Sequence, residues 1–208
     1  IPDRHLTFAF IDPAISQADT ADFSGITVVH TAVDKQWYVQ LAERRKITPT
    51  EIVDLVFALH KHFNCSAIGI EDIAYQKALL YMIHEESLRR GVYPPVKGIH
   101  PGTKNTKETR ILGLVPRFEW GRISLARGLQ DFEKEYLEFP RSSHDDILDS
   151  LSQIEQIAHY PEGENATDEP PKIGEFVDPN HPGYERWYRN QAHLNANSGG
   201  DYSNEEEN

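Results

Sequence analysis

Hydrophobic residues in the first three quarters of the chain fall into short runs typical of strands and helices. Residues 6–14, 24–34 and 35–45 are rich in β-branched and aromatic residues. This pattern predicts three consecutive strands that form a meander. Two later runs, "AIGIED" at 67–72 and "YPPVKGIHP" at 93–101, have the composition of short buried strands. Five strands are therefore expected.

Apolar residues at helical spacing mark the segments between and after these strands. They predict helices over residues 48–64, 74–91, 129–140 and 143–160. Thr48 or Thr50 is the expected N-cap of the first helix, and Ser143 or Asp145 that of the last. Residues 102–128 form a polar, basic segment that is expected to run into a helix, with a short extended piece near its end. Strands that alternate with helices indicate an α/β fold.

The composition changes after Tyr160. Residues 161–208 carry eleven acids and three bases among many Pro, Gly and Asn residues. Such a segment buries too little apolar area to offset the entropy of ordering. We therefore expect one domain over residues 1–160 and a largely mobile acidic tail over residues 161–208.

Charge is distributed unevenly along the chain. The formal net charge is −12 over 208 residues, and the predicted tail contributes −8 of it. Residues 97–127 instead hold seven bases against two acids. This local excess of positive charge is compatible with a polyanionic partner.

The single cysteine, Cys65, excludes an internal disulfide and a zinc site built from cysteines. No apolar run is long enough to span a bilayer, and no secretory signal is visible. A reducing, intracellular setting without a membrane is therefore expected.

Carboxylates stand where two of the apolar runs end. The stretch "LTFAFIDPA" runs without a break into Asp12, and "AIGIED" ends on Glu71 and Asp72. A buried ionised carboxylate is costly unless a cation, hydrogen-bond donors or a metal compensates it. If the two strands are parallel neighbours, Asp12 and Glu71 lie about 5 Å apart, the spacing between adjacent strands.

A third group of carboxylates begins the last predicted helix. Asp145, Asp146 and Asp149 follow His144, and their spacing puts Asp149 on one helix face with either of the other two. Several carboxylates without thiols or a pair of histidines select a hard cation, Mg²⁺ or Mn²⁺. Two such ions about 4 Å apart stabilise the attacking and leaving oxygens of a phosphoryl displacement.

The order of these features resembles the RNase H-like superfamily, in its resolvase-like branch. A meander with Asp on the first strand, an acid on the fourth and "HDDILDSL" on a late helix are similar to the C-terminal nuclease domain of viral large terminases. "DFSGITVV" resembles that family's entry into the second strand, and "TKETRI" resembles its Lys-x-x-Arg loop. The resemblance spans residues 6–160. It implies a central mixed five-stranded sheet flanked by helices on both faces.

The resemblance also implies roles for individual residues. The acids implied as metal ligands are Asp12, Glu71, Asp146, Asp145 and Asp149, of which the first three are also implied to be catalytic. The bases implied to contact DNA are Lys104, Lys107 and Arg110.

The implied activity is that of a metal-dependent endonuclease, with two Mg²⁺ or Mn²⁺ ions, that cuts duplex DNA with little sequence specificity during viral genome packaging. Its implied partners are double-stranded DNA, a terminase ATPase motor, the portal and the small terminase subunit, in the host cell cytoplasm. The sequence contains no G-x-x-x-x-G-K-[ST] motif, so motor activity is not expected of this chain.

Two other functions are compatible with the same residues. A Holliday-junction resolvase uses similar acids but works as a dimer, and a non-catalytic RNase H-like scaffold would dock DNA or a capsid protein with its acids as remnants. Structural interpretations also exist for single residues: Asp12 as a strand-end acid bonded to the backbone, Asp145 as a helix cap, and Asp72 in the place of Glu71. Metal-dependent cleavage separates the enzymes from the scaffold.

Overall fold

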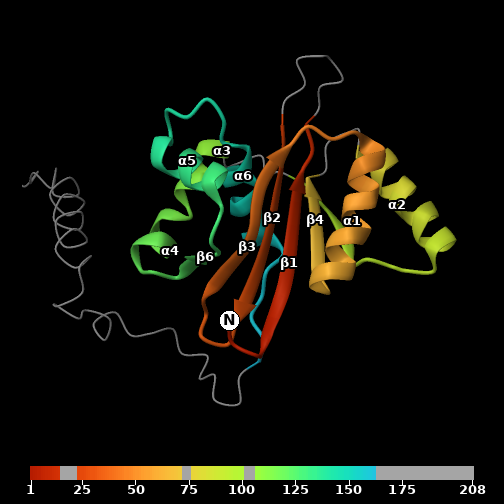
Figure 1. Cartoon of the computed structure of the whole chain (residues 1–208), viewed down its shortest axis with the longest axis horizontal. Helices are drawn as coiled ribbons and strands as arrows, with labels where there is room; N and C mark the ends of the chain where they lie inside the picture. Colours follow the sequence, from red (N-terminus) through yellow and green to blue (C-terminus); the bar gives the residue numbers. More distant parts are fainter. Residues whose placement is uncertain (15–22, 72–75, 101–105, 163–208) are drawn as a thin grey trace, which may run out of the picture. The chain divides into compact units, whose positions relative to one another are not determined.

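The computed structural model describes residues 1–14, 23–71, 76–100 and 106–162, and these form a sheet between two layers of helices (Figure 1). All of them belong to one unit, Ile1–Glu164. The predicted acidic tail lies outside the described residues from position 163 onward, so its mobility stays a prediction. Lys104 and Asp72 also lie outside the described residues.

The sheet of the described residues has six strands in the order β5-β4-β1-β2-β3-β6. The strands are β1 (His5–Asp12), β2 (Ser24–Ala32), β3 (Trp37–Arg45), β4 (Ala67–Glu71), β5 (Val96–Ile99) and β6 (Ile123–Leu125). β1, β2 and β3 form the antiparallel meander. β4 pairs in parallel with β1, β5 with β4, and β6 with β3, so the sheet is mixed as expected.

The expected number of five strands is wrong by one. All five predicted strands are present, and β6 adds a sixth at the edge next to β3. β6 has only three residues, of which Ile123 alone is buried, so it is too short to show a period of two. Its place is set by backbone bonds to β3, from Trp37 N to Arg122 O at 2.9 Å and from Ala126 N to Val39 O at 2.9 Å.

The helices are α1 (Pro49–Phe63), α2 (Gln76–Arg90), α3 (Lys107–Leu112), α4 (Val115–Glu119), α5 (Gln130–Glu138), α6 (Asp146–Gln153) and the 3-10 turn η1 (Ile154–Gln156). The N-cap of α1 is Thr48, because its hydroxyl accepts a hydrogen bond from the Glu51 amide and its amide donates to the Glu51 carboxylate at 2.7 Å. The last predicted helix is shorter than expected, since its α-helical part ends at Gln153.

Apolar side chains fill both sides of the sheet. Phe10 of β1 packs on one face in a cluster with Leu151 of α6. Its neighbour Ile11 packs on the other face in a cluster with Val56 of α1, because successive residues of a strand point to opposite faces. The prediction of helices on both faces is therefore confirmed, and α6 is the helix that faces the sheet on the side of Phe10.

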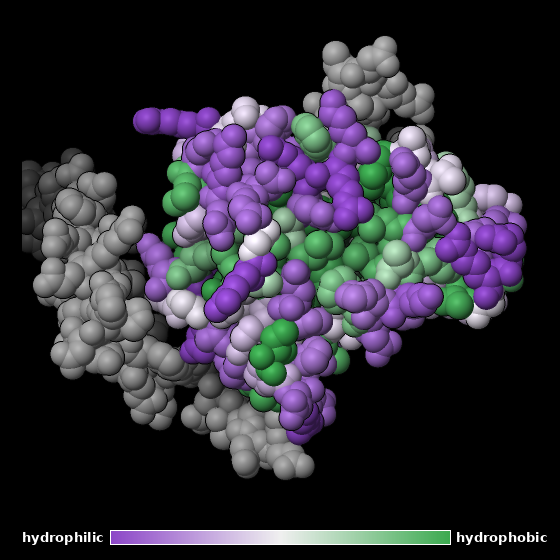
Figure 2. Space-filling model, viewed as in Figure 1, coloured by the Kyte–Doolittle hydropathy of each residue, from purple (hydrophilic) through white to green (hydrophobic). Residues whose placement is uncertain are grey.

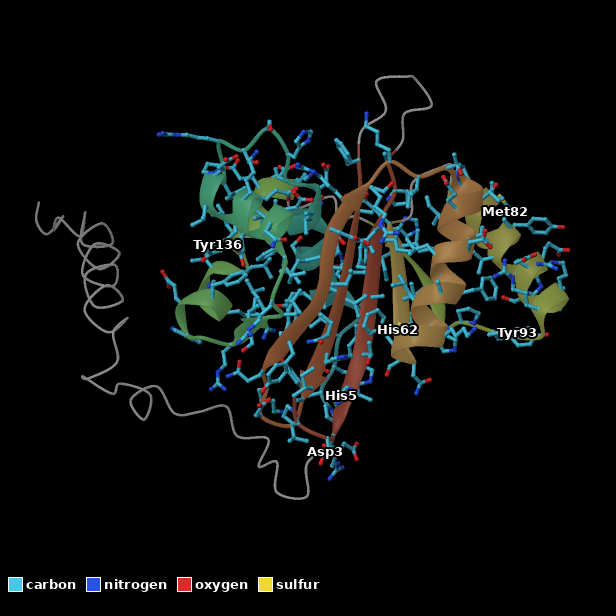
Figure 3. All side chains as sticks on the ribbon, viewed as in Figure 1. Asp3, His5, His62, Met82, Tyr93 and Tyr136 are labelled. Carbon is cyan, nitrogen blue, oxygen red and sulfur yellow. The ribbon has the colours of Figure 1, made fainter. Side chains whose placement is uncertain are left out.

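The outer surface is mixed in character. Hydrophilic residues cover both flanks of the view in Figure 2, and hydrophobic residues show along the middle, around the strands and α1. Tyr81, Met82 and Tyr93 are exposed on α2 and just after it, and Figure 3 shows Met82 and Tyr93 on the outer side of the molecule. In the described part of the chain, no helix is both long enough and apolar enough to cross a membrane.

Candidate active site

A row of four residues crosses the sheet where β1 and β4 end. Asp12 pairs with Gly25 of β2, and Gly25 pairs with Arg44 of β3. On the other side, the pairing of Ile11 with Ile70 places Asp12 next to Glu71 of β4. Residues directly opposite each other on paired strands share a face of the sheet. Two carboxylates, a glycine and a guanidinium therefore lie side by side on one face.

The two carboxylates of this row are in direct contact. Burial raises the pKa of Asp12, and a hydrogen bond with Glu71 together with the negative charge of Glu71 raises it further. Glu71 itself is only 8% exposed. The raised pKa favours the protonated form of the half-buried Asp12 unless a cation is present. The expected proximity of Asp12 and Glu71 is thus confirmed.

Helix α6 lies directly on this row, and Gly25 makes this possible. A Cβ atom at Gly25 would lie 2.1 Å from the carbonyl oxygen of Asp146, well inside van der Waals contact. The Ser150 hydroxyl donates to the carbonyl of Phe10 at 3.1 Å and is 3.0 Å from Oγ1 of Thr27, which fastens α6 to β1 and β2. The helix is therefore seated on the backbone of the sheet.

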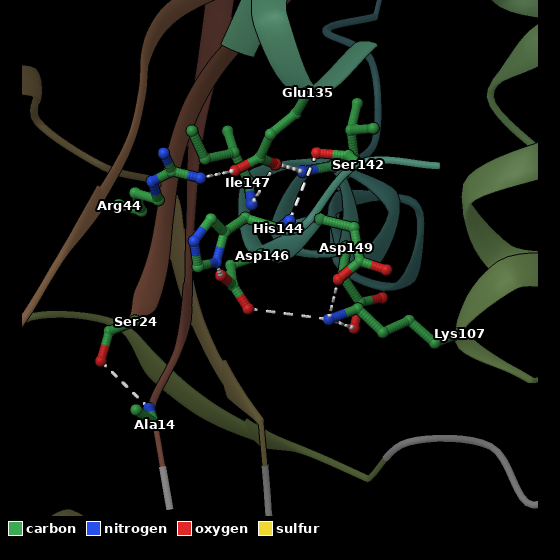
Figure 4. A network of polar contacts seen from close by, with 12 residues as sticks. Ala14, Ser24, Arg44, Lys107, Glu135, Ser142, His144, Asp146, Ile147 and Asp149 are labelled. Atoms are coloured by element: carbon green, nitrogen blue, oxygen red, sulfur yellow. Dashed lines mark hydrogen bonds and ion pairs between the residues drawn. The ribbon is translucent and has the colours of Figure 1, made fainter. Parts of the chain in front are cut away.

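The acids of α6 meet two cations from α3. Arg110 donates to both carboxylate oxygens of Asp149 at 2.8 and 3.0 Å, and Asp149 is only 3% exposed. Lys107 Nζ lies 2.7 Å from Asp145, 3.8 Å from Asp146 and 3.7 Å from Asp149 (Figure 4). Two of the three bases that the sequence assigned to DNA, Lys107 and Arg110, thus contact carboxylates here.

The charges of this cluster influence one another. Burial raises the pKa of Asp146 and of Asp149. The positive charge of Lys107 opposes this shift at both acids, and Arg110 opposes it at Asp149. Burial by itself would lower the pKa of Lys107, but the hydrogen bond to Asp145 and the charges of Asp149 and Asp146 hold it above its usual value. His144 Nδ1 lies 3.8 Å from Asp146.

Helix α6 also reaches the β4 side of the row. The side-chain amide of Gln153 donates to Glu71 Oε1 at 3.4 Å, and Gln153 is fully buried. The acids of two strands and one helix are thus held in one region by contacts with α6.

Of the two residues expected to begin α6, the structure has Asp145 and not Ser143 as the N-cap. Asp145 is at the N-cap position, but its side chain makes no capping hydrogen bond because it pairs with Lys107. The acceptor comes from α5: Glu135 Oε2 accepts from the amides of Ile147 at 3.0 Å and Leu148 at 3.3 Å. No local pattern links a residue of one helix to the amides of the next.

Glu135 also has a cationic partner in the row across the sheet. Arg44 donates to Glu135 Oε1 at 3.1 Å, and the Glu135 side chain is 1% exposed. Burial raises the pKa of Glu135 to about 7, although the two amides and Arg44 oppose this shift. Neither Glu135 nor Arg44 was a candidate from the sequence, and neither stands out locally, since Lys134 precedes Glu135 and charged residues flank Arg44 on both sides.

No protein-family model and no curated protein matches the chain significantly. Solved structures do match. The nuclease domain of the large terminase subunit of bacterial virus Sf6 has a TM-score of 0.53 and 11% identity, over 73% of this chain and 88% of that one. The large terminase nuclease of the thermophilic phage G20c has a TM-score of 0.52 and 19% identity, over 71% and 78%. The human cytomegalovirus terminase nuclease domain has a TM-score of 0.52 and 14% identity, over 74% of this chain and 83% of that one.

These neighbours are RNase H-like domains. The chain has the RNase H-like fold. Of the three structures named above, those from Sf6 and cytomegalovirus contain manganese and that from phage G20c contains zinc. At these identities the likeness establishes the shared fold of the sheet and its helices.

The donor atoms on this RNase H-like sheet are of the kind that a hard divalent cation takes. Asp12, Glu71, Asp146 and Asp149 lie in this region with no thiol among them, and carboxylate oxygens suit Mg²⁺ or Mn²⁺. Across the described residues, however, no group of three or more His, Cys, Asp or Glu is arranged to hold a metal ion. Lys107 and Arg110 compensate the acids of α6, and the raised pKa of Asp12 favours its protonated form.

Proposed function

We propose that this chain is a divalent-metal-dependent endonuclease that cuts duplex DNA by phosphodiester hydrolysis. The observation that carries the proposal is the contact between Asp12 and Glu71 on two parallel strands, with Asp149 of α6 near enough for its charge to act on Asp12. Without a cation, burial and the neighbouring Glu71 disfavour the ionised form of Asp12 and raise its pKa. A divalent cation would remove that cost and would let both groups ionise.

The residues that would hold the metal ions are Asp12, Glu71 and Asp146, with Asp145 and Asp149 as further ligands. When bound, two Mg²⁺ or Mn²⁺ ions would activate water and stabilise the charge that develops on the phosphate. Carboxylates from separate elements would fix the scissile phosphate relative to the attacking water. The buried positions of Glu71 and Asp149 would keep these oxygens in place during the reaction.

Lys107 and Arg110 are proposed to contact DNA phosphates, together with Lys104. Their present partners are the carboxylates that we assign to the metal, so a cation and a phosphate would replace both sets of contacts at once. Few sequence-specific contacts are expected, because phosphate contacts position a duplex without reading its bases.

The biological setting is proposed from the fold and the sequence resemblance. The chain would act as the nuclease of a viral DNA-packaging terminase in the host cell cytoplasm. Its partners there would be the ATPase motor, the portal and the small subunit. Their contact surfaces are not assigned to residues of this chain.

The test is cleavage of supercoiled plasmid by this chain in Mn²⁺, Mg²⁺ or EDTA, beside the Asp12→Asn and Asp146→Asn variants. We expect nicked and linear products only with a divalent metal, and none from either variant. Cleavage that survives Asp12→Asn would overturn the site assignment. No cleavage by the folded wild-type chain would favour the non-catalytic scaffold, and preferential symmetric cutting of a four-way junction would favour the resolvase.

A further inference from the structure

Helix α6 carries acids that we assign to the metal, yet it does not cap its own first turn. The first amides of a helix need acceptors from outside the helix. Asp145, at the N-cap, makes no such bond and lies 2.7 Å from Lys107 instead. The position of Asp146 therefore depends on what satisfies the next two amides.

Glu135 of α5 is the residue that satisfies them. Its Oε2 accepts from Ile147 and Leu148, the second and third residues of α6, at 3.0 and 3.3 Å. Figure 4 shows this carboxylate between α6 and Arg44 of β3, which donates to Oε1 at 3.1 Å. Both oxygens are thus bonded within a side chain that is 1% exposed.

Burying the charge of Glu135 costs free energy, so stabilisation of the fold alone is a poor explanation for this residue. A buried charge pair seldom stabilises a fold more than apolar residues of the same volume would. It does fix geometry, because both oxygens must keep their donors. Arg44 pairs across the sheet with Gly25, and the carbonyl of Asp146 lies against Gly25. The bonds of Glu135 therefore link the first turn of α6 to the part of the sheet on which that turn rests.

We propose that Glu135 is a positioning residue for Asp146. Together with Arg44, it fixes the first turn of α6 on the sheet at Gly25, and so fixes the position of Asp146 relative to Asp12 on the neighbouring strand. This inference rests on the proposed metal-dependent nuclease function. It adds a residue from α5 that touches neither metal nor substrate and acts only through α6.

The experiment compares Glu135→Ala with Glu138→Ala, which removes the same charge from the exposed end of the same helix. For each folded variant, Mn²⁺ affinity is measured by titration, and kcat and KM are measured on duplex DNA. For Glu135→Ala we expect Mn²⁺ affinity lower by about 10- to 100-fold, the usual effect of removing a partner that orients a ligand. We expect kcat lower by on the order of 100-fold, as for a misplacement of about 1 Å. KM should stay within about twofold, since Lys107 and Arg110 are intact.

Amide hydrogen exchange supplies a readout that does not depend on activity. In Glu135→Ala, the amides of Ile147 and Leu148 should lose protection, while those in the middle of α1 keep theirs. The double variant Glu135→Gln/Arg44→Met removes both charges but keeps a carbonyl for the two amides. It should recover Mn²⁺ affinity and kcat to within about tenfold of wild type, since the lost partner is largely replaced.

A folded Glu135→Ala variant whose Mn²⁺ affinity and kcat lie within about twofold of wild type would overturn the inference. If Glu135→Ala does not fold, the double variant decides, and low activity from a stable double variant counts against positioning by the carbonyl. Failure of the proposed function has a different signature, because the wild-type chain itself would then neither bind Mn²⁺ nor cut DNA.

Discussion

Replacement of Gly25 by alanine tests whether the backbone of the sheet sets the position of α6. The new methyl group would lie 2.1 Å from the carbonyl oxygen of Asp146 and 2.8 Å from its carbonyl carbon, whereas ordinary contact begins at 3.4 Å. Both atoms belong to the backbone, so no side-chain rotation relieves the clash. The first turn of α6 must therefore move away from β2 by about 1 Å, a displacement that costs on the order of 100-fold in rate when it affects a reacting group.

The change should also lower stability, because overpacking a close contact costs about 1–3 kcal/mol. The assay is the initial rate of Mn²⁺-dependent plasmid cleavage, at a temperature where urea unfolding curves show the variant to be folded. We expect kcat to fall by about two orders of magnitude in the folded fraction.

Gly91→Ala provides the matched control. Gly91 has a φ of 65°, and a Cβ atom there would have no neighbour within 4 Å, so alanine meets backbone strain without a clash. It should cost about 1 kcal/mol of stability and leave the cleavage rate unchanged. Normal kcat from Gly25→Ala, whatever its stability, would refute the reasoning that Gly25 positions Asp146.

Two predictions concern titration. Burial and the nearby His5 lower the pKa of His30 to about 4, and both residues lie far from Asp12 along β1 and β2 (Figure 3 labels His5). The unfolded state therefore binds the extra proton first, and stability falls as the pH drops from about 6.5 to 4, by about 2 kcal/mol between pH 7 and 5. Urea unfolding of His30→Gln should lack this loss of stability, and a pH dependence equal to that of wild type would contradict the prediction. The raised pKa of Glu135 changes stability with pH in the opposite direction, and it does so equally in wild type and variant. For Asp12, the raised pKa means that metal-free stability falls as the pH rises. In EDTA at pH 8, the free energy of unfolding of Asp12→Asn should exceed that of wild type by about 1–3 kcal/mol. Mn²⁺ should raise the Tm of wild type alone, and an equal rise in the variant would exclude Asp12 as a ligand.

Much of the fold follows from local patterns. Alternating and continuous apolar runs predicted five of the six strands, and the Thr48–Glu51 capping box places the start of α1. The short strand β6 was not counted because it is held by pairing with β3 rather than by its own pattern. The end of α6 was also misjudged, since the amphipathic pattern continues through the 3-10 turn at Ile154–Gln156.

For the candidate site, too, local patterns in the sequence predicted some of the residues. Asp12 and Glu71 could be found from the sequence, because each ends an apolar run and parallel strands bring such ends together. The sequence also placed Asp145, Asp146 and Asp149 on one helix, as the structure does for the last two, with Asp145 at its cap. Lys107 and Arg110 contact carboxylates here, and their expected contact with DNA stays a prediction.

What the sequence determined by itself is therefore the set of elements and the acids at their ends, since periodicity and strand ends are local properties of the chain. Only the tertiary structure decided that Gly25 supports Asp146, that Asp145 leaves the capping of α6 to another residue, and that Glu135 and Arg44 take up this role. These relations depend on strand register and on the approach of one helix to another. Both are set by the packing of the whole core, and no residue carries a local signal of its distant partner.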